Sequence, residues 1–198
     1  MNPQINRFLK EKEEEHSTQH SATYTFSSDS KALFEDFLTT DAMGEDYFET
    51  SEDTEQMKIS EENSRWIFEN IPEYFNVIKK EGKIVGYSFL MPSTKNIMEN
   101  FVSGMINEAE LFDGIKKMDS EFLVRPEAVY LCSFYVDENN RRRGLASIAG
   151  IKTISSIASR FNITPTLFAW RYSDEGRLLC RKIAKVMGFD LKFRKEQL

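Results

Sequence analysis

The feature of this sequence that most constrains its fold is a strand, a polar loop and a long helix that follow one another between residues 128 and 161. Residues 128–136 (AVYLCSFYV) form the strongest β-strand pattern in the chain. The loop DENNRRRG comes next, and apolar residues then recur at helical spacing from Leu145 to Phe161. A strand that leads through a short loop into a helix is typical of a sheet covered by helices.

The rest of the chain predicts further strands and helices around this unit. Strands are expected at residues 21–26, 74–79, 83–91, 166–172 and 189–194, with a hairpin turn at 81–82. Helices are expected at 31–40 after a cap at 28–30, and at 64–70, 94–118 and 174–187, while 119–126 is a connector. This order predicts an α/β (α+β) fold: a mixed central sheet flanked by helices, with a helical insertion between strands 3 and 4.

Length and composition suit one domain with an appendage. The 198 residues are 40% hydrophobic and include 16 Phe, enough to bury a core. We expect residues 1–20 to be a charged N-terminal arm or helix and residues 21–198 to be a single domain. No signal peptide and no apolar run long enough to span a bilayer is present, which predicts a cytoplasmic protein without a membrane partner.

Cysteine and histidine usage argues against metal or triad chemistry. Cys132 and Cys180 stand apart in apolar surroundings, and the two histidines, His16 and His20, lie in a polar N-terminal stretch. We therefore expect buried free thiols and no metal site.

Charge is distributed unevenly along the chain. Residues 1–136 hold 13 Lys/Arg and 26 Asp/Glu, a net charge of −13, whereas residues 137–198 hold 13 Lys/Arg and 6 Asp/Glu, a net charge of +7. An anionic cofactor that meets the C-terminal part fits this asymmetry better than a nucleic acid, which usually requires a larger basic field. On charge alone, solvation of the surface explains the pattern equally well.

The loop before the long helix has the composition of an anion site. The first amide N–H groups of a helix have no partner inside it and carry partial positive charge. Gly144 and Ala146 leave room for a ligand to approach the backbone, and three arginines precede them. A pyrophosphate would fit this arrangement, and so would an ordinary strand–helix turn with a solvated arginine run.

The same loop resembles a family signature. Arg141, Gly144 and Ala146 take the first, middle and last positions of the Arg/Gln-x-x-Gly-x-Gly/Ala pattern of the GNAT superfamily of N-acetyltransferases. The spacing of eight residues from the strand end at Val136 to Gly144 also matches that family. The order of a helix, a strand, a second helix and Gly188 that follows matches it too. The resemblance covers residues 128–190 in detail.

This resemblance implies an N-acetyltransferase that moves an acetyl or short acyl group from acetyl-CoA to a primary amine. The loop amides would hold the pyrophosphate, the central strand would pair with the pantetheine arm, and an N–H near Tyr135 or Val136 would polarise the thioester. The residues expected to contact coenzyme A are Phe134, Tyr135, Val136, Arg141, Arg142, Arg143, Gly144, Leu145, Ala146 and Ser173.

The sequence departs from the family in its proton-handling residues. Tyr130 stands where some members have a glutamate base. Counted back from Gly188, Ala184 stands where many members have a tyrosine acid and Arg177 where they have an Asn; counted forward from the strand end, the Asn position is Ser173. Tyr130 and Tyr172 are the remaining candidates. A catalytically inactive acyl-CoA-binding or regulatory module is the alternative. Only ten residues follow Gly188, so one strand of the family is absent, supplied by another chain, or replaced by the N-terminal arm.

The acceptor is expected to meet an acidic stretch between residues 41 and 62. Its Asp and Glu side chains would attract a cation: a small amine, a polyamine, an amino sugar or a lysine side chain. The residues concerned are Glu45, Asp46, Glu49, Glu52, Asp53 and Glu55. A mobile, solvated loop has the same composition. A small-molecule acceptor is favoured over a protein, no nucleic acid is expected, and the protein would be a monomer or a homodimer.

Overall fold

A six-stranded mixed sheet forms the centre of the molecule in a computed structural model, which describes residues 3–19, 24–28, 32–48, 53–58 and 60–195. The strand order is β1-β2-β3-β4-β5-β6; β1 to β4 are antiparallel, and β4, β5 and β6 are parallel. The strands are β1 Tyr24–Phe26, β2 Phe75–Lys80, β3 Lys83–Ser93, β4 Ala128–Val136, β5 Thr166–Ala169 and β6 Leu191–Phe193. The predicted fold class is confirmed.

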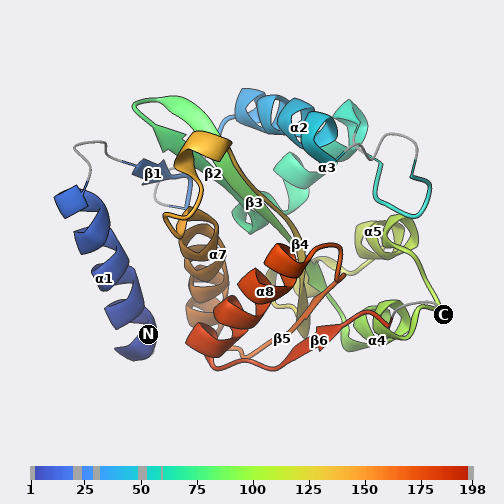
Figure 1. The fold of residues 1–198 in the computed structure, drawn as a ribbon. Helices are drawn as coiled ribbons and strands as arrows, with labels where there is room; N and C mark the ends of the chain where they lie inside the picture. The colour runs from blue at the N-terminus through green and yellow to red at the C-terminus, as the bar shows by residue number, and fades with distance from the viewer. Residues whose placement is uncertain (1–2, 20–23, 29–31, 49–52, 59, 196–198) are drawn as a thin grey trace.

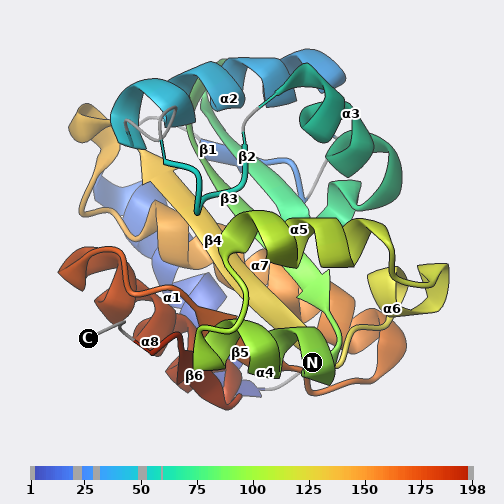
Figure 2. The same ribbon diagram turned by 90° about the vertical axis from the view of Figure 1, so that its right-hand side faces the viewer.

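Helices cover both faces of this sheet (Figures 1 and 2). One face carries α7 (Leu145–Phe161) and α8 (Asp174–Met187), with α1 (Pro3–Gln19) packed on both. The other face carries α2 Phe34–Phe48, α3 Glu61–Asn70, α4 Lys95–Ser103, α5 Glu108–Lys116 and α6 Ser120–Val124. Helices α4, α5 and α6 lie between β3 and β4 in the chain and form the predicted insertion.

The single helix expected over residues 94–118 is wrong, because two helices occupy this segment. Gly104 ends α4 in a left-handed conformation (φ 85°), which a glycine adopts without strain. Asn107 then starts α5 through a capping box in which its side chain and that of Glu110 each accept a backbone N–H. The expected connector at 119–126 also contains a short helix, α6.

Other predicted helix and strand boundaries differ from the observed ones by several residues. Helix α2 continues to Phe48, through the first third of the acidic stretch, and β5 ends at Ala169 rather than at residue 172. The hairpin turn is confirmed, since Glu81 (φ 50°) and Gly82 (φ 79°) both have positive φ. Several expectations lie outside the described residues: the strand start at 21–23, the cap at 29–30, and His20, Glu49 and Glu52.

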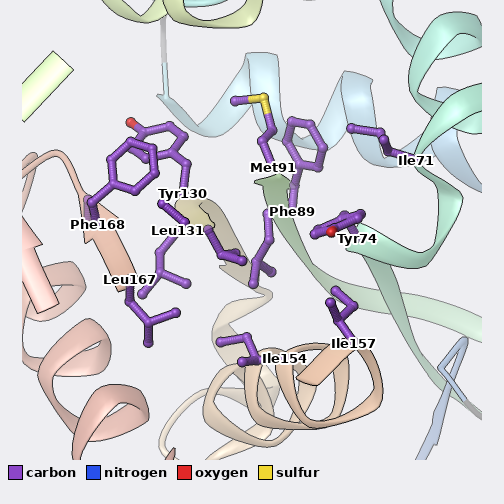
Figure 3. Close-up of a cluster of buried hydrophobic side chains, with 14 of the residues drawn as sticks. Ile71, Tyr74, Phe89, Met91, Tyr130, Leu131, Ile154, Ile157, Leu167 and Phe168 are labelled. Carbon is purple, nitrogen blue, oxygen red and sulfur yellow. The ribbon is translucent and has the colours of Figure 1, made fainter. Parts of the chain in front are cut away.

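The core lies on both sides of the sheet. Figure 3 shows Tyr130 and Phe168 on one side, and Leu167 on the side where α7 places Ile154 and Ile157. All five side chains are less than 5% exposed. The aromatic content predicted to supply the core does so mainly on the α4 and α5 side, where the Tyr130 and Phe168 ring centroids are 5.1 Å apart.

Strand β6 occupies the position next to β5. Leu191, Lys192 and Phe193 pair in parallel with residues 167–169. Within the described part of the chain the sheet ends there, and the N-terminal segment is a helix on the α7 and α8 face rather than a strand. Of the three explanations for the absent strand, replacement by the N-terminal arm is therefore excluded for residues 3–19. No helix in the described ranges is both long and apolar enough to cross a bilayer.

Candidate active site

The site lies where β4 and β5 separate. These strands pair only over residues 128–130 and 166–168, so β5 does not cover the edge of β4 from Leu131 onward. A cavity of 1080 Å³ opens along this edge. It extends from the start of α7 to side chains from α2, α3 and α5, a volume in the upper range of small-molecule sites.

One end of the cavity is the N-terminus of α7. The first intrahelical bond there runs from the Ile148 N–H to the Gly144 carbonyl at 3.0 Å, so the amides of residues 145–147 have no partner within the helix. No side chain caps α7, whereas Ser60, Thr94, Asn107 and Ser173 cap α3, α4, α5 and α8. Gly144 (φ 76°) and Arg142 (φ 62°) turn the loop so that it curves around this end.

Nine of the ten residues predicted to contact coenzyme A line this cavity. They are Phe134, Tyr135, Val136, Arg141, Arg142, Gly144, Leu145, Ala146 and Ser173. Arg143 is not part of the lining, and its Nη1 atom is buried without a hydrogen-bond partner.

Two lysines that the sequence analysis did not single out also lie near the loop. Lys182 of α8 lines the cavity, and the Lys12 side chain of α1 reaches within 3.6 Å of the position that a Cβ on Gly144 would take. Only the packing of α1 and α8 against α7 brings these cations to the loop.

Hydrogen bonds within the loop hold its shape. The Asp137 carboxylate accepts from the backbone N–H groups of Asn139 and Asn140 and from the Asn140 side chain. Arg141 donates from Nε to the Val136 carbonyl at 2.8 Å, and its guanidinium lies 5.0 Å from the Tyr47 ring centroid. Arg141 is thus fixed between the end of β4 and α2, with its charge at the cavity.

A β-bulge in β4 lies in the middle of the cavity. Phe89 pairs with Ser133 and Leu90 pairs with Leu131, which leaves Cys132 as the extra residue. The bulge puts two successive side chains on the α5 side, because the Cys132 thiol contacts Glu108 and the Ser133 hydroxyl contacts Tyr87. After the bulge the side chains of β4 again alternate between the two faces of the sheet. Each one points to the face opposite to the one it would take in a strand without the bulge.

Glu108 at the start of α5 is the most unusual side chain in the cavity. It is 7% exposed, and its Oε1 accepts from the Tyr130 hydroxyl at 2.7 Å and contacts the Cys132 thiol at 3.6 Å. Its Oε2 accepts from the Met57 N–H at 3.0 Å. Burial raises the pKa of Glu108, against the opposing effect of these hydrogen bonds.

The two thiols in the cavity are not activated. Burial raises the pKa of Cys132 well above its ordinary value and that of Cys180 to about 12, so both are neutral at physiological pH. Among the residues described, no group of three His, Cys, Asp or Glu could hold a metal ion.

The two tyrosines singled out from the sequence have different surroundings. Tyr130 is 1% exposed and bonded to Glu108, whereas Tyr172 is 59% exposed at the mouth of the cavity, with its ring centroid 6.0 Å from that of Trp170. Glu108 itself was not predicted from the sequence. It lies 22 residues before Tyr130 in an ordinary helix start, and no local pattern marks it as buried.

A sheet that splays beside a bulged strand, with an uncapped helix start at the end of the gap, defines an acetyltransferase-type domain. Residues 40–171, two thirds of the chain, match the acetyltransferase (GNAT) family. The chain belongs to this family, and the predicted acyltransferase class is thereby confirmed.

Several solved structures are similar to the chain at low sequence identity. An aminoglycoside acetyltransferase from an uncultured soil metagenomic sample, in complex with trehalose, is 16% identical over 89% of this chain and 91% of its own, with a TM-score of 0.48. The aminoglycoside N-acetyltransferase AAC(6')-Iy in complex with CoA is 13% identical over 91% and 97%, also with a TM-score of 0.48. A ribosomal-protein-alanine N-acetyltransferase from Brucella melitensis is 12% identical over 82% and 90%, with a TM-score of 0.44. No curated protein sequence matches the chain.

Proposed function

We propose that this protein transfers an acetyl or short acyl group from acetyl-CoA to a primary amine. The observation that carries the proposal is that one cavity joins the uncapped start of α7 to the edge of β4 that β5 does not cover. An anionic ligand with an extended, amide-containing arm fits both features at once, because the helix start attracts phosphates and the strand edge is not covered by β5 beyond Tyr130.

The charges around the loop support the fit of the pyrophosphate. Arg141, Arg142 and Lys182 line this end of the cavity, and the amides of residues 145–147 point out of the helix start. A side chain at position 144 would project toward Lys12, so the glycine keeps this approach open. When bound, acetyl-CoA supplies the activated acyl group.

The residues of the chain would handle the proton of the acceptor. A primary amine must lose a proton to attack, since its ammonium form (pKa about 10.4 for a lysine) is not nucleophilic. Glu108 lines the cavity with both oxygens accepting hydrogen bonds from donors, which is the pattern of a carboxylate, and its raised pKa makes it a stronger base than an exposed glutamate.

In this scheme Glu108 takes the amine proton and Tyr130 orients it. The neutral amine adds to the thioester carbonyl; when the resulting oxyanion collapses, the C–S bond breaks and the leaving thiolate takes the second proton of the attacking nitrogen. Backbone N–H groups at the bulge would stabilise the oxyanion. The donor near Tyr135 or Val136 stays a prediction. The bulge residue Cys132 lies three residues before Tyr135 in β4 and contacts Glu108.

A thermal-shift experiment with acetyl-CoA tests the cofactor. A ligand that binds only the folded protein raises its melting temperature, by an amount that grows with concentration. We expect Gly144→Glu to abolish this rise, because the carboxylate would lie against the phosphates. Gly188→Glu is the matched control: Gly188 also has positive φ (70°), it ends α8, and a Cβ there would meet no atom within 4 Å. Both variants carry the same strain of about 1–2 kcal/mol.

Turnover tests the reaction. Release of coenzyme A from acetyl-CoA in the presence of amines should depend on both substrates and should be lost in Gly144→Glu. Binding of acetyl-CoA without transfer to any amine would instead support the inactive module. An unchanged thermal shift in folded Gly144→Glu would refute the assigned phosphate site.

A further inference from the structure

The wall of the cavity formed by α2, β2 and β3 is aromatic. Its rings come from these three elements and make contact in a row. The members are Phe37, Tyr47, Phe48, Phe75, Tyr87 and Phe89. Phe37 stacks on Phe75 with centroids 4.1 Å apart, Phe75 on Tyr87 at 5.6 Å, and Tyr87 on Tyr135 of β4 at 6.0 Å. This wall offers a flat apolar surface beside the bulge.

One carboxylate, that of Asp41 on α2, interrupts this wall. It accepts a short hydrogen bond from the Ser64 hydroxyl, and burial raises its pKa. Among the described residues, no lysine or arginine forms an ion pair with Asp41. A partly buried carboxylate in an aromatic wall is stabilised by a cation, so the cavity has a place for one positive charge.

Asp41 and Glu108 both line the cavity near the bulge. Burial is the main cause of the raised pKa of the Tyr87 hydroxyl, the negative charge of Asp41 adds to it, and this hydroxyl lies 3.3 Å from Ser133 Oγ. Glu108 contacts the other bulge residue, Cys132. An amine that reaches the bulge therefore meets two acids.

Of the six acidic side chains predicted to attract the acceptor, the three whose side chains the structure describes, Glu45, Asp53 and Glu55, lie outside the cavity. Glu45 is exposed on α2, Asp53 accepts from Glu55 and Gln56 in its own turn, and Glu55 lies 3.6 Å from Arg194. None of these three lines the cavity. Among the described residues, the carboxylates in the cavity lining are those of Asp41, Glu108 and Glu175, so an acceptor with several positive charges would find few negative partners there.

Resting on the proposed function, we infer that the acceptor is a primary amine carried on a flat apolar ring. The ring packs against this aromatic wall at Tyr47, which is 49% exposed, because Phe75 and Tyr87 are already covered by their neighbours. Asp41 draws the ammonium group to the bulge, where Glu108 removes its proton. A polyhydroxylated amine would leave its hydroxyl groups unpaired against these rings, and a long acyl chain would bury Asp41 without a cation.

A panel of amines tests this assignment. We expect 2-phenylethylamine to be acetylated with a kcat/KM at least tenfold above those of spermidine, glucosamine and Nα-acetyl-lysine. Binding of 2-phenylethylamine in the presence of CoA, measured by calorimetry, gives a readout that does not need turnover. Preference for spermidine or glucosamine, or tighter binding of octanoyl-CoA than of acetyl-CoA together with rejection of 2-phenylethylamine, would overturn the inference.

The substitution Asp41→Asn tests whether Asp41 attracts the ammonium group of the acceptor. The amide keeps an oxygen for Ser64, so the fold is expected to persist, while KM and Kd for 2-phenylethylamine rise about tenfold and the KM for acetyl-CoA stays the same. Asp113→Asn is the control, because Asp113 is exposed on α5, pairs with Lys116 at 3.0 Å and is absent from the lining. Equal effects of the two substitutions would contradict the role of Asp41. Loss of acetyl-CoA binding in the wild type would instead refute the proposed function itself.

Discussion

Replacing Tyr130 by phenylalanine isolates the hydrogen bond at the centre of the site. The Tyr130 hydroxyl donates to Glu108 Oε1 at 2.7 Å, and both residues are buried. Without it, Oε1 keeps only the weak contact with the Cys132 thiol at 3.6 Å, while Oε2 still accepts from the Met57 N–H. A hydrogen bond to a charged group contributes about 1.5–3 kcal/mol. We expect the free energy of unfolding to fall by about 2 kcal/mol, or about 4–8 °C in Tm for a chain of this size.

The loss should depend on pH in a defined direction. Because the pKa of Glu108 is raised in the folded protein, the stability of the wild type falls as pH rises from the unfolded value of about 4.3 through the folded pKa. Tyr130→Phe removes a donor to the charged form and raises that pKa further. The difference between variant and wild type should therefore be largest at high pH and shrink where the carboxyl is protonated in both.

Urea unfolding between pH 4.5 and 8.5 measures this difference. Tyr74→Phe is the control, since Tyr74 is also fully buried but donates to a neutral acceptor, the Leu123 carbonyl, at 3.0 Å. Its cost, about 1 kcal/mol, should not vary over this range. Tyr130→Phe and Glu108→Gln should also be non-additive in the double variant. A cost of Tyr130→Phe that is independent of pH, or strict additivity, would refute the description of Glu108 as a buried carboxylate.

Two further substitutions probe catalysis and packing. Glu108→Gln should lower kcat by about 10²- to 10⁴-fold with an unchanged KM for acetyl-CoA, and should abolish the wild-type loss of rate as pH falls through the raised pKa of Glu108; initial rates over a pH series check this. Gly150→Ala places a Cβ 2.9 Å from atoms of both Ile183 and Phe134, so overpacking should lower the free energy of unfolding by about 1–3 kcal/mol in urea titrations.

The coenzyme A end of the site could be predicted because its information is local. The alternation of β4, the helical period of α7 and the glycine between them lie within 34 consecutive residues, and each follows from backbone geometry alone. The hairpin at Glu81 and Gly82 was equally local. The division of residues 94–118 into two helices could also have been predicted from the sequence, since Gly104 marks a helix end and the pair Asn107 and Glu110 marks a helix start.

The placement of the residues at the proposed acceptor end depends on the tertiary structure. Glu108 looks like an ordinary first-turn glutamate, and only the packing of α5 under residues 55–57 and over β4 buries it against Tyr130. The bulge at Cys132 depends on the register between β3 and β4, which a pattern within one strand does not contain. Asp41 enters the cavity because α2 lies across β3.

The local sequence of this chain therefore predicted the proposed anion site, and the tertiary structure brought together the residues proposed to handle the proton. Helix starts and glycine turns act through neighbouring backbone groups, so their effect is written in consecutive residues. The pKa of a carboxylate depends on desolvation and on partners from distant segments, such as Ser64 for Asp41 and Tyr130 for Glu108, and these contacts exist only once the chain has packed.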